Sequence, residues 1–155
     1  MKIQELIQKN GVITELKSSG KMEAVDRIAR FMCSVNGLSN ADEVSAKIIE
    51  RETEMSTGIG FGIAIPHGRL SGIDRLYMVA ARSVEGIEFD ALDEQPVHLI
   101  FMMISPANTS AEHTEALSSL SRIMAYEEVR SKLLETKTPE EFLEILAEAE
   151  NKYVG

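Results

Sequence analysis

A nearly unbroken run of apolar residues, VHLIFMMI from Val97 to Ile104, is the feature that most limits the folds open to this chain. A strand with one face in water alternates apolar and polar residues, whereas a strand covered on both faces is almost continuously apolar. The run is also far shorter than the roughly 20 residues needed to cross a bilayer. We therefore expect a central strand covered on both faces, and no direct membrane insertion.

Helical patterns precede this run. A first helix is predicted by apolar residues at helical spacing that end before Gly37, a residue suited to a left-handed cap: Met22, Val25, Ile28, Ala29 and Met32. Ser39 can cap a second helix, in which Val44, Ile48 and Arg51 fall on one stripe. Arg51 is therefore expected to point roughly where the core-facing side chains point.

Helical patterns also follow the central apolar run. A capping box from Thr109 to Glu112 predicts a helix just after the central strand, and a second box from Thr138 to Glu141, with proline in the first turn, opens a closing helix. Between them, EEVRSKLLE places Val129 and Leu133 on one helical face.

Three further apolar segments bounded by turn residues are predicted as strands: GIAI (62–65), LYMVAAR (76–82) and GIEF (86–89). Helices before and after a group of strands favour an α/β fold, a three-layer sandwich with a mixed central sheet and helices on both faces. The strand order stays open. The length of 155 residues and the absence of a Pro/Gly/Ser-rich linker predict one domain over residues 1–155.

The charge balance limits the partners. The chain has 16 Lys and Arg against 25 Asp and Glu, a formal net charge of -9. Such a surface repels nucleic acid and anionic membranes on average, so a bound anion must be held locally. The single cysteine, Cys33, cannot form an internal disulfide, and the first residues lack the apolar region of a secretory signal; we expect a cytoplasmic protein with a buried, inert thiol.

The stretch STGIGFGIAIPHGR has glycines at 58, 60 and 62. The dinucleotide-binding fingerprint fails because its third glycine position holds Ile63, and no phosphate-binding loop follows, so no cofactor is predicted. The glycines alone are equally typical of a tight turn. His67 adds to them, because Pro66 restricts the backbone before it and a neutral imidazole has one bare nitrogen that can act as a nucleophile.

His113 lies on the inward stripe of its helix with Leu117 and Leu120, in a first turn where the helix dipole favours a neutral ring. A structural role is an alternative for both histidines. His98 begins the central strand and so lies about 20 Å from its far end, which removes a three-histidine metal cluster and predicts no metal. Arg51, beside the glycine-rich turn, can hold phosphoryl oxygens; compensation of the helix dipole together with a surface ion pair is its alternative. No serine-hydrolase motif is present, and the acidic residues are interpreted as solvated helix faces.

Two segments resemble the mannitol/fructose-type enzyme IIA domain of the bacterial phosphoenolpyruvate:sugar phosphotransferase system, including its nitrogen-regulatory members. RETEMSTGIGFGIAIPHGR (51–69) resembles the active-site signature, and GIEFDALDEQPVHLIFMMISPANTSAEH (86–113) resembles the segment with the second histidine. The resemblance covers roughly residues 20–146. The mannitol-specific pattern has a glutamate at the position of Phe61, and fructose-type domains usually have a polar residue there. This difference leaves the sugar open and argues against mannitol.

The resemblance implies three catalytic residues. His67 would accept a phosphoryl group from the phosphorylated histidine carrier protein and pass it to an enzyme IIB partner, with His113 beside it and Arg51 neutralising the phosphate. A nitrogen-regulatory role, in which phosphorylation controls binding to regulatory proteins, is the alternative, and an anion-binding or scaffolding domain without transfer is a third. We also expect the non-reacting nitrogen of His67 to donate to a carbonyl of the glycine-rich turn.

Overall fold

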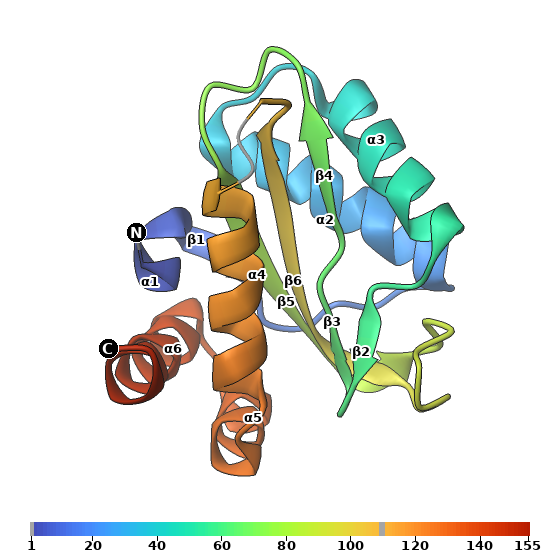
Figure 1. Cartoon of the computed structure of the whole chain (residues 1–155). Helices are drawn as coiled ribbons and strands as arrows, with labels where there is room; N and C mark the ends of the chain where they lie inside the picture. The colour runs from blue at the N-terminus through green and yellow to red at the C-terminus, as the bar shows by residue number, and fades with distance from the viewer. Residues whose placement is uncertain (1, 109–110) are drawn as a thin grey trace.

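A computed structural model describes residues 2–108 and 111–155, and in this part of the chain six helices surround a six-stranded sheet (Figure 1). The helices are α1 (Ile3–Leu6), α2 (Lys21–Asn36), α3 (Ala41–Glu54), α4 (Ala111–Met124), α5 (Glu127–Glu135) and α6 (Pro139–Tyr153). The strands are β1 (Ile7–Ile13), β2 (Gly58–Gly60), β3 (Ile63–Ala64), β4 (His67–Leu70), β5 (Tyr77–Ile87) and β6 (Val97–Pro106).

The sheet is mixed. Its strand order is β1-β5-β6-β3-β2, and β4 also pairs with β6. β5 is antiparallel to β6 and parallel to β1, whereas β3 and β4 are both parallel to β6. The strand made by the longest apolar run is therefore paired on both sides, as expected for a central strand.

Side chains of β6 alternate between two hydrophobic cores. Ile100, Met102 and Ile104 join the core under α2 and α3, while Leu99, Phe101 and Met103 join the core under α4, α5 and α6. Figure 1 shows the two groups of helices on opposite faces of the sheet. The predicted three-layer α/β sandwich is confirmed, and the apolar run is explained by burial on both faces.

The strands β3 and β4 lie end to end along the same side of β6. Ile63 and Ala64 pair with Leu99 and Ile100, and His67 pairs with Met103. The break between them comes at Pro66, which has no N–H to donate, but its carbonyl oxygen accepts from the backbone N–H of Met103 at 3.1 Å. The chain thus stays aligned with the central strand up to His67.

Several predicted helix ends are confirmed and others are corrected. Gly37 ends α2 in the left-handed conformation with φ 67°, and the Thr138 hydroxyl caps α6 by accepting from the Glu141 N–H. Asn40, not Ser39, occupies the N-cap of α3. Met22 is partly exposed because it faces outward in the first turn of α2. The box predicted at Thr109 lies outside the described residues.

The strand predictions need two corrections. GIAI forms only the two-residue β3, because the backbone bends at Gly62 (φ 77°) before it and stops pairing at Pro66 after it. GIEF is not a separate strand, because β5 continues through an irregular register to Ile87 and Phe89 lies beyond it. The elements β1, β2, β4 and α1 were not predicted. β2, β4 and α1 are too short to show a periodic pattern, and β1 has three exposed residues in succession rather than an alternation.

Gly86 makes the continuation of β5 possible. Its φ is 85°, and a Cβ there would lie 2.8 Å from Cε1 of His98. Only glycine fits both the backbone and the contact. No helix in the described part of the chain is long and apolar enough to cross a membrane.

Candidate functional site

His67 is fixed at the first position of β4, and its side chain is partly buried. Its Nδ1 donates a hydrogen bond to the carbonyl oxygen of Ile65 at 2.8 Å. We expected this carbonyl in the glycine-rich turn; it lies just beyond the last glycine of the turn, two residues before the histidine. With the Nδ1 proton engaged, the neutral ring carries its lone pair on Nε2.

His113 comes from the first turn of α4 and is 3% exposed. The centroids of its ring and the His67 ring are 5.1 Å apart, and the ring planes meet at 72°. The Ser105 hydroxyl at the end of β6 forms a short hydrogen bond with Nδ1 of His113. When the hydroxyl donates, the proton of the neutral His113 is on Nε2, which can donate to a ligand.

The surroundings of both histidines favour the neutral form of the ring. Burial lowers the pKa of His67, Arg51 and Arg69 lower it further, and the Ile65 carbonyl opposes them. Burial, followed by the charges of His67 and Arg69, lowers the pKa of His113 to about 4. The neutral His113 was expected from the helix dipole; burial is instead the leading cause.

Arg51 lies in the last turn of α3 and is half-buried, so it borders the inward stripe rather than continuing it. The buried positions of α3 are Val44, Ser45, Ile48 and Glu52, and three of them, Val44, Ile48 and Glu52, are spaced by four residues. The expected direction of Arg51 is therefore only partly right. Its guanidinium donates to the Met55 carbonyl oxygen at 2.8 Å, which leaves its other donors for a ligand.

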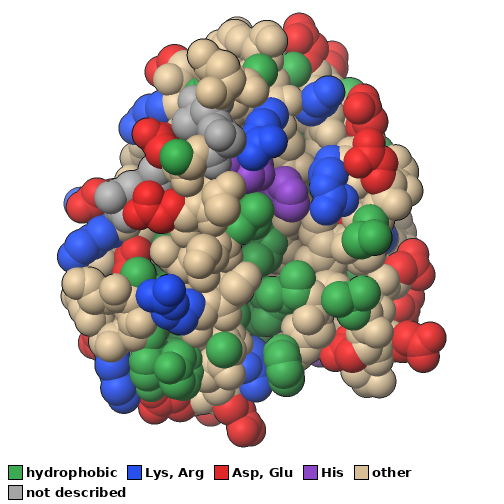
Figure 2. All heavy atoms as spheres, in the orientation of Figure 1, with side chains coloured by type: hydrophobic (Ala, Val, Ile, Leu, Met, Phe, Trp, Pro, Cys, Tyr) green, Lys and Arg blue, Asp and Glu red, His purple; other side chains and the backbone are tan. Residues whose placement is uncertain are grey.

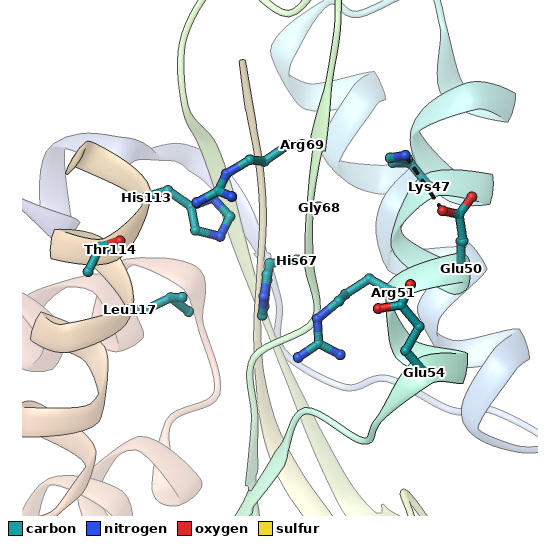
Figure 3. Close-up of a pocket in the computed structure, with 10 residues that line it drawn as sticks. All are labelled: Lys47, Glu50, Arg51, Glu54, His67, Gly68, Arg69, His113, Thr114 and Leu117. Carbon is teal, nitrogen blue, oxygen red and sulfur yellow. Dashed lines mark ion pairs between the residues drawn. The ribbon is translucent and has the colours of Figure 1, made fainter. Parts of the chain in front are cut away.

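Arg69 was not singled out from the sequence. It lies two residues after His67 on β4, and alternate residues of a strand share a face, so this spacing was a signal that could have found it. Figure 3 shows Arg51 from α3 and Arg69 from β4 on opposite sides of His67. Among residues 2–108 and 111–155, neither arginine has a carboxylate within 4.0 Å.

These side chains border one hollow of about 390 Å³. Its lining comes from α3, β4 and the start of α4, and consists of Lys47, Glu50, Arg51, Glu54, His67, Gly68, Arg69, His113, Thr114 and Leu117. Figure 2 shows the histidines at its floor with cationic side chains on both sides, although the chain as a whole is acidic. Lys47 pairs with Glu50 at 3.6 Å, so the two arginines supply the local positive charge.

His98 lies apart from this hollow, at the start of β6, where its Nδ1 is 2.9 Å from the Ser83 carbonyl oxygen. Among the described residues, no group of three or more His, Cys, Asp or Glu side chains could hold a metal ion. Cys33 is buried, and burial raises the pKa of its thiol.

Two acidic side chains contradict the interpretation of solvated helix faces. Glu52 and Glu150 are both buried and accept backbone hydrogen bonds, Glu52 from Thr57 and Glu150 from Ile3 and Gln4. Glu52 could have been found from its place eight residues after Val44 on the inward stripe of α3. Nothing in the sequence pattern alone indicates the partners of Glu150.

Residues 5–149 match the sequence profile of the family described as "Phosphoenolpyruvate-dependent sugar phosphotransferase system, EIIA 2". The chain belongs to this family. It is 38% identical over 128 residues to the fructose-specific EIIA component of Haloferax volcanii, a match that covers 83% of each protein. It is 34% identical over 146 residues to the fructose-specific EIIABC component of Bacillus subtilis, but spans only 23% of that protein's length.

Solved structures agree with this assignment. The nitrogen regulatory protein IIA-Ntr of Neisseria meningitidis superimposes with a TM-score of 0.86 at 31% identity, over 93% of this chain and 98% of that chain. The mannitol enzyme IIA of Escherichia coli, solved in complex with phosphorylated enzyme IIB, gives a TM-score of 0.77 at 23% identity, over 92% and 97% of the two chains. At that identity the second likeness concerns the fold alone.

Proposed function

We propose that this protein is a phosphocarrier that accepts a phosphoryl group on Nε2 of His67 from the phosphorylated histidine carrier protein and passes it to an enzyme IIB of the fructose type. The observation that carries the proposal is the hydrogen bond from Nδ1 to Ile65, which leaves Nε2 with its lone pair facing the cationic hollow. Membership of the EIIA 2 family supports phosphotransfer in general.

In the transfer step the Nε2 lone pair of His67 attacks phosphorus while the phosphorus–nitrogen bond of the donor phosphohistidine breaks. The bonding electrons return to the donor nitrogen, and the Nδ1 proton of His67 stays hydrogen-bonded to the Ile65 carbonyl. Transfer to the next carrier reverses these roles. Because no covalent help is needed from other side chains, the rate depends on position and charge.

Arg51, Arg69 and His113 are placed to stabilise the three oxygens of the phosphoryl group. The arginines carry permanent charge, whereas His113 stays neutral and donates a hydrogen bond from Nε2. Such preorganised donors stabilise charge that develops in the transition state. A neutral donor beside two cations also avoids binding the phosphate so tightly that it cannot leave.

The test is labelling with phosphoenolpyruvate, enzyme I and the histidine carrier. The parent protein is expected to take up one acid-labile phosphoryl group and to lose it on addition of a fructose-type enzyme IIB. His67→Ala is expected to remain unlabelled. Equal labelling of parent and variant would show that another residue is the acceptor.

A regulatory role is the second candidate, and the likeness to IIA-Ntr over nearly the whole chain favours it. In this role phosphorylation of His67 would add about two negative charges and change which protein binds at the hollow. Binding assays with phosphorylated protein and with His67→Ala distinguish the roles. A transport carrier captures the histidine carrier and enzyme IIB only, whereas a regulator binds a further protein in one phosphorylation state. Either role fits a cytoplasmic location, as the sequence predicts.

A further inference from the structure

Glu52 is a buried carboxylate directly after Arg51 on α3, and it is not among the residues that line the hollow. Its Oε2 accepts from the backbone N–H of Thr57 at 2.9 Å, and its Oε1 accepts from the Thr57 hydroxyl at 2.5 Å. Lys21, at the start of α2, lies 2.9 Å from Oε2 and neutralises the charge. One carboxylate therefore holds both the backbone and the side chain of Thr57.

Two hydrogen bonds, one between backbone groups and one from the His67 ring to a backbone carbonyl, connect Thr57 to the imidazole. The Thr57 carbonyl oxygen accepts from the Ile65 N–H at 3.1 Å, and the Ile65 carbonyl oxygen accepts from Nδ1 of His67 at 2.8 Å. The N–H and the C=O of each residue belong to adjacent peptide planes, so the connection is geometric rather than electronic. It fixes the place of the carbonyl oxygen that orients the ring.

A second connection holds the same segment. Lys21 also donates to the Phe89 carbonyl oxygen at 3.0 Å, and that oxygen accepts from the Ser56 hydroxyl at 2.7 Å. The segment before β2 is thus held from both sides, by α3 and by the loop after β5. The ammonium group of Lys21 joins these two attachments.

A buried ion pair is weak grounds for stability, because desolvation of two charges offsets most of their attraction and apolar residues often replace such pairs without loss. Stability alone therefore does not explain the presence of Glu52. What an apolar residue at this position cannot do is accept two hydrogen bonds from Thr57. The carboxylate is the group that defines where Thr57, and through it Ile65, must lie.

We propose that Glu52, paired with Lys21, is a positioning residue for phosphoryl transfer, which acts through Thr57 and Ile65 to hold the His67 ring with Nε2 directed into the hollow. The inference rests on the proposed function for its effect on rate, but its effect on the ring is independent of any phosphate donor. Glu52 touches neither the imidazole nor a ligand in the hollow.

Charge provides a second readout. The groups that act on His67 are Arg51 and Glu52 from α3, Arg69 from β4 and His113 from α4. The arginines lower the pKa of His67, whereas the negative charge of Glu52 raises it. Removing that charge is expected to lower the pKa of His67 further, provided that the fold is kept.

The variant Glu52→Gln keeps the shape of the side chain and removes the charge that pairs with Lys21. Its matched control is Glu150→Gln, which removes another buried carboxylate that accepts from backbone N–H groups, at 2.6 and 3.1 Å, in the opposite layer on α6. Labelling of His67 by the phosphorylated carrier is expected to slow roughly 10- to 100-fold in Glu52→Gln, because small misplacements of a nucleophile have effects of this size. Glu150→Gln is expected to label at the parental rate.

Nitrogen NMR of the His67 ring shows directly which ring nitrogen carries the proton. The parent is expected to show the tautomer with the proton on Nδ1, and Glu52→Gln a mixture of tautomers with a lower pKa, while Glu150→Gln matches the parent. If Glu52→Gln does not fold, Thr57→Val, which removes only the hydroxyl donor, is expected to shift the tautomer in the same direction. Parental tautomer and pKa in the folded variant would overturn the proposal.

The two proposals fail in different ways. Absence of labelling in the parent protein would overturn the proposed function, and the NMR comparison would still decide the role of Glu52. A parental labelling rate in Glu52→Gln, together with normal labelling of the parent, would overturn the positioning role and leave the phosphocarrier function intact.

Discussion

The pKa of His113 predicts how the stability of the fold depends on pH. It is about 4 in the folded chain against an ordinary value of 6.5. Between pH 6.5 and pH 4, His113 therefore binds a proton in the unfolded chain but not in the folded chain. The contribution of His113 to stability is full above pH 6.5 and is lost as the pH falls toward 4. At pH 5 the linkage relation gives a loss of about 2 kcal/mol. Because the ring borders an open hollow, where solvent screens charge, the expected loss is about 1 kcal/mol.

The assay is urea unfolding of the parent and of His113→Asn at pH 8 and pH 5. Asparagine offers the Ser105 hydroxyl an acceptor near the place of Nδ1 but does not titrate, so carboxylates that titrate in both proteins cancel in the comparison. The parent is expected to lose about 1 kcal/mol more than the variant on going from pH 8 to pH 5. Equal losses would show that His113 is not held neutral by its surroundings.

Three other predictions concern the site and the fold. Arg69→Gln should slow labelling of His67 by roughly 10-fold or more, because a charged donor to the phosphoryl group is lost. It should also raise the His67 pKa in an NMR titration, and an unchanged pKa would show that the guanidinium does not lie near the ring. Ser105→Ala should slow labelling and allow both tautomers of His113, which NMR would detect. A single unchanged tautomer would show that the Ser105 hydroxyl does not fix the proton of His113 on Nε2. Thr138→Ala should lower the free energy of unfolding by about 1 kcal/mol through loss of the α6 cap, with urea unfolding as the measurement.

Much of the architecture could be predicted because local sequence patterns report it. A fully apolar run predicts a strand with two covered faces, and Gly37 and Thr138 mark helix ends through their own conformational preferences. The short strands could not be predicted in this way. β4 exists because the backbone at His67 lies against Met103 of β6, and that pairing depends on a residue far away in the sequence.

The same contrast, between local patterns and contacts with distant segments, applies to the candidate site. His67, His113 and Arg51 could be singled out because proline, the helix start and the helical stripe each restrict a direction, and the structure brings all three to one hollow. Their roles remain predictions. The burial of Glu52 was missed because a carboxylate on a helix is usually solvated, and only the approach of Lys21 and Thr57 from other segments makes its burial possible.

The hydrogen bond between the Met103 N–H and the Pro66 carbonyl oxygen has a consequence for local opening. Met103 lies on the strand that both cores cover, so its amide becomes accessible to solvent only when the layers on each side separate. In deuterium exchange, this amide should be among the slowest in the chain. The backbone that holds His67, the proposed phosphoryl acceptor, would then stay paired with β6 through every fluctuation short of complete unfolding.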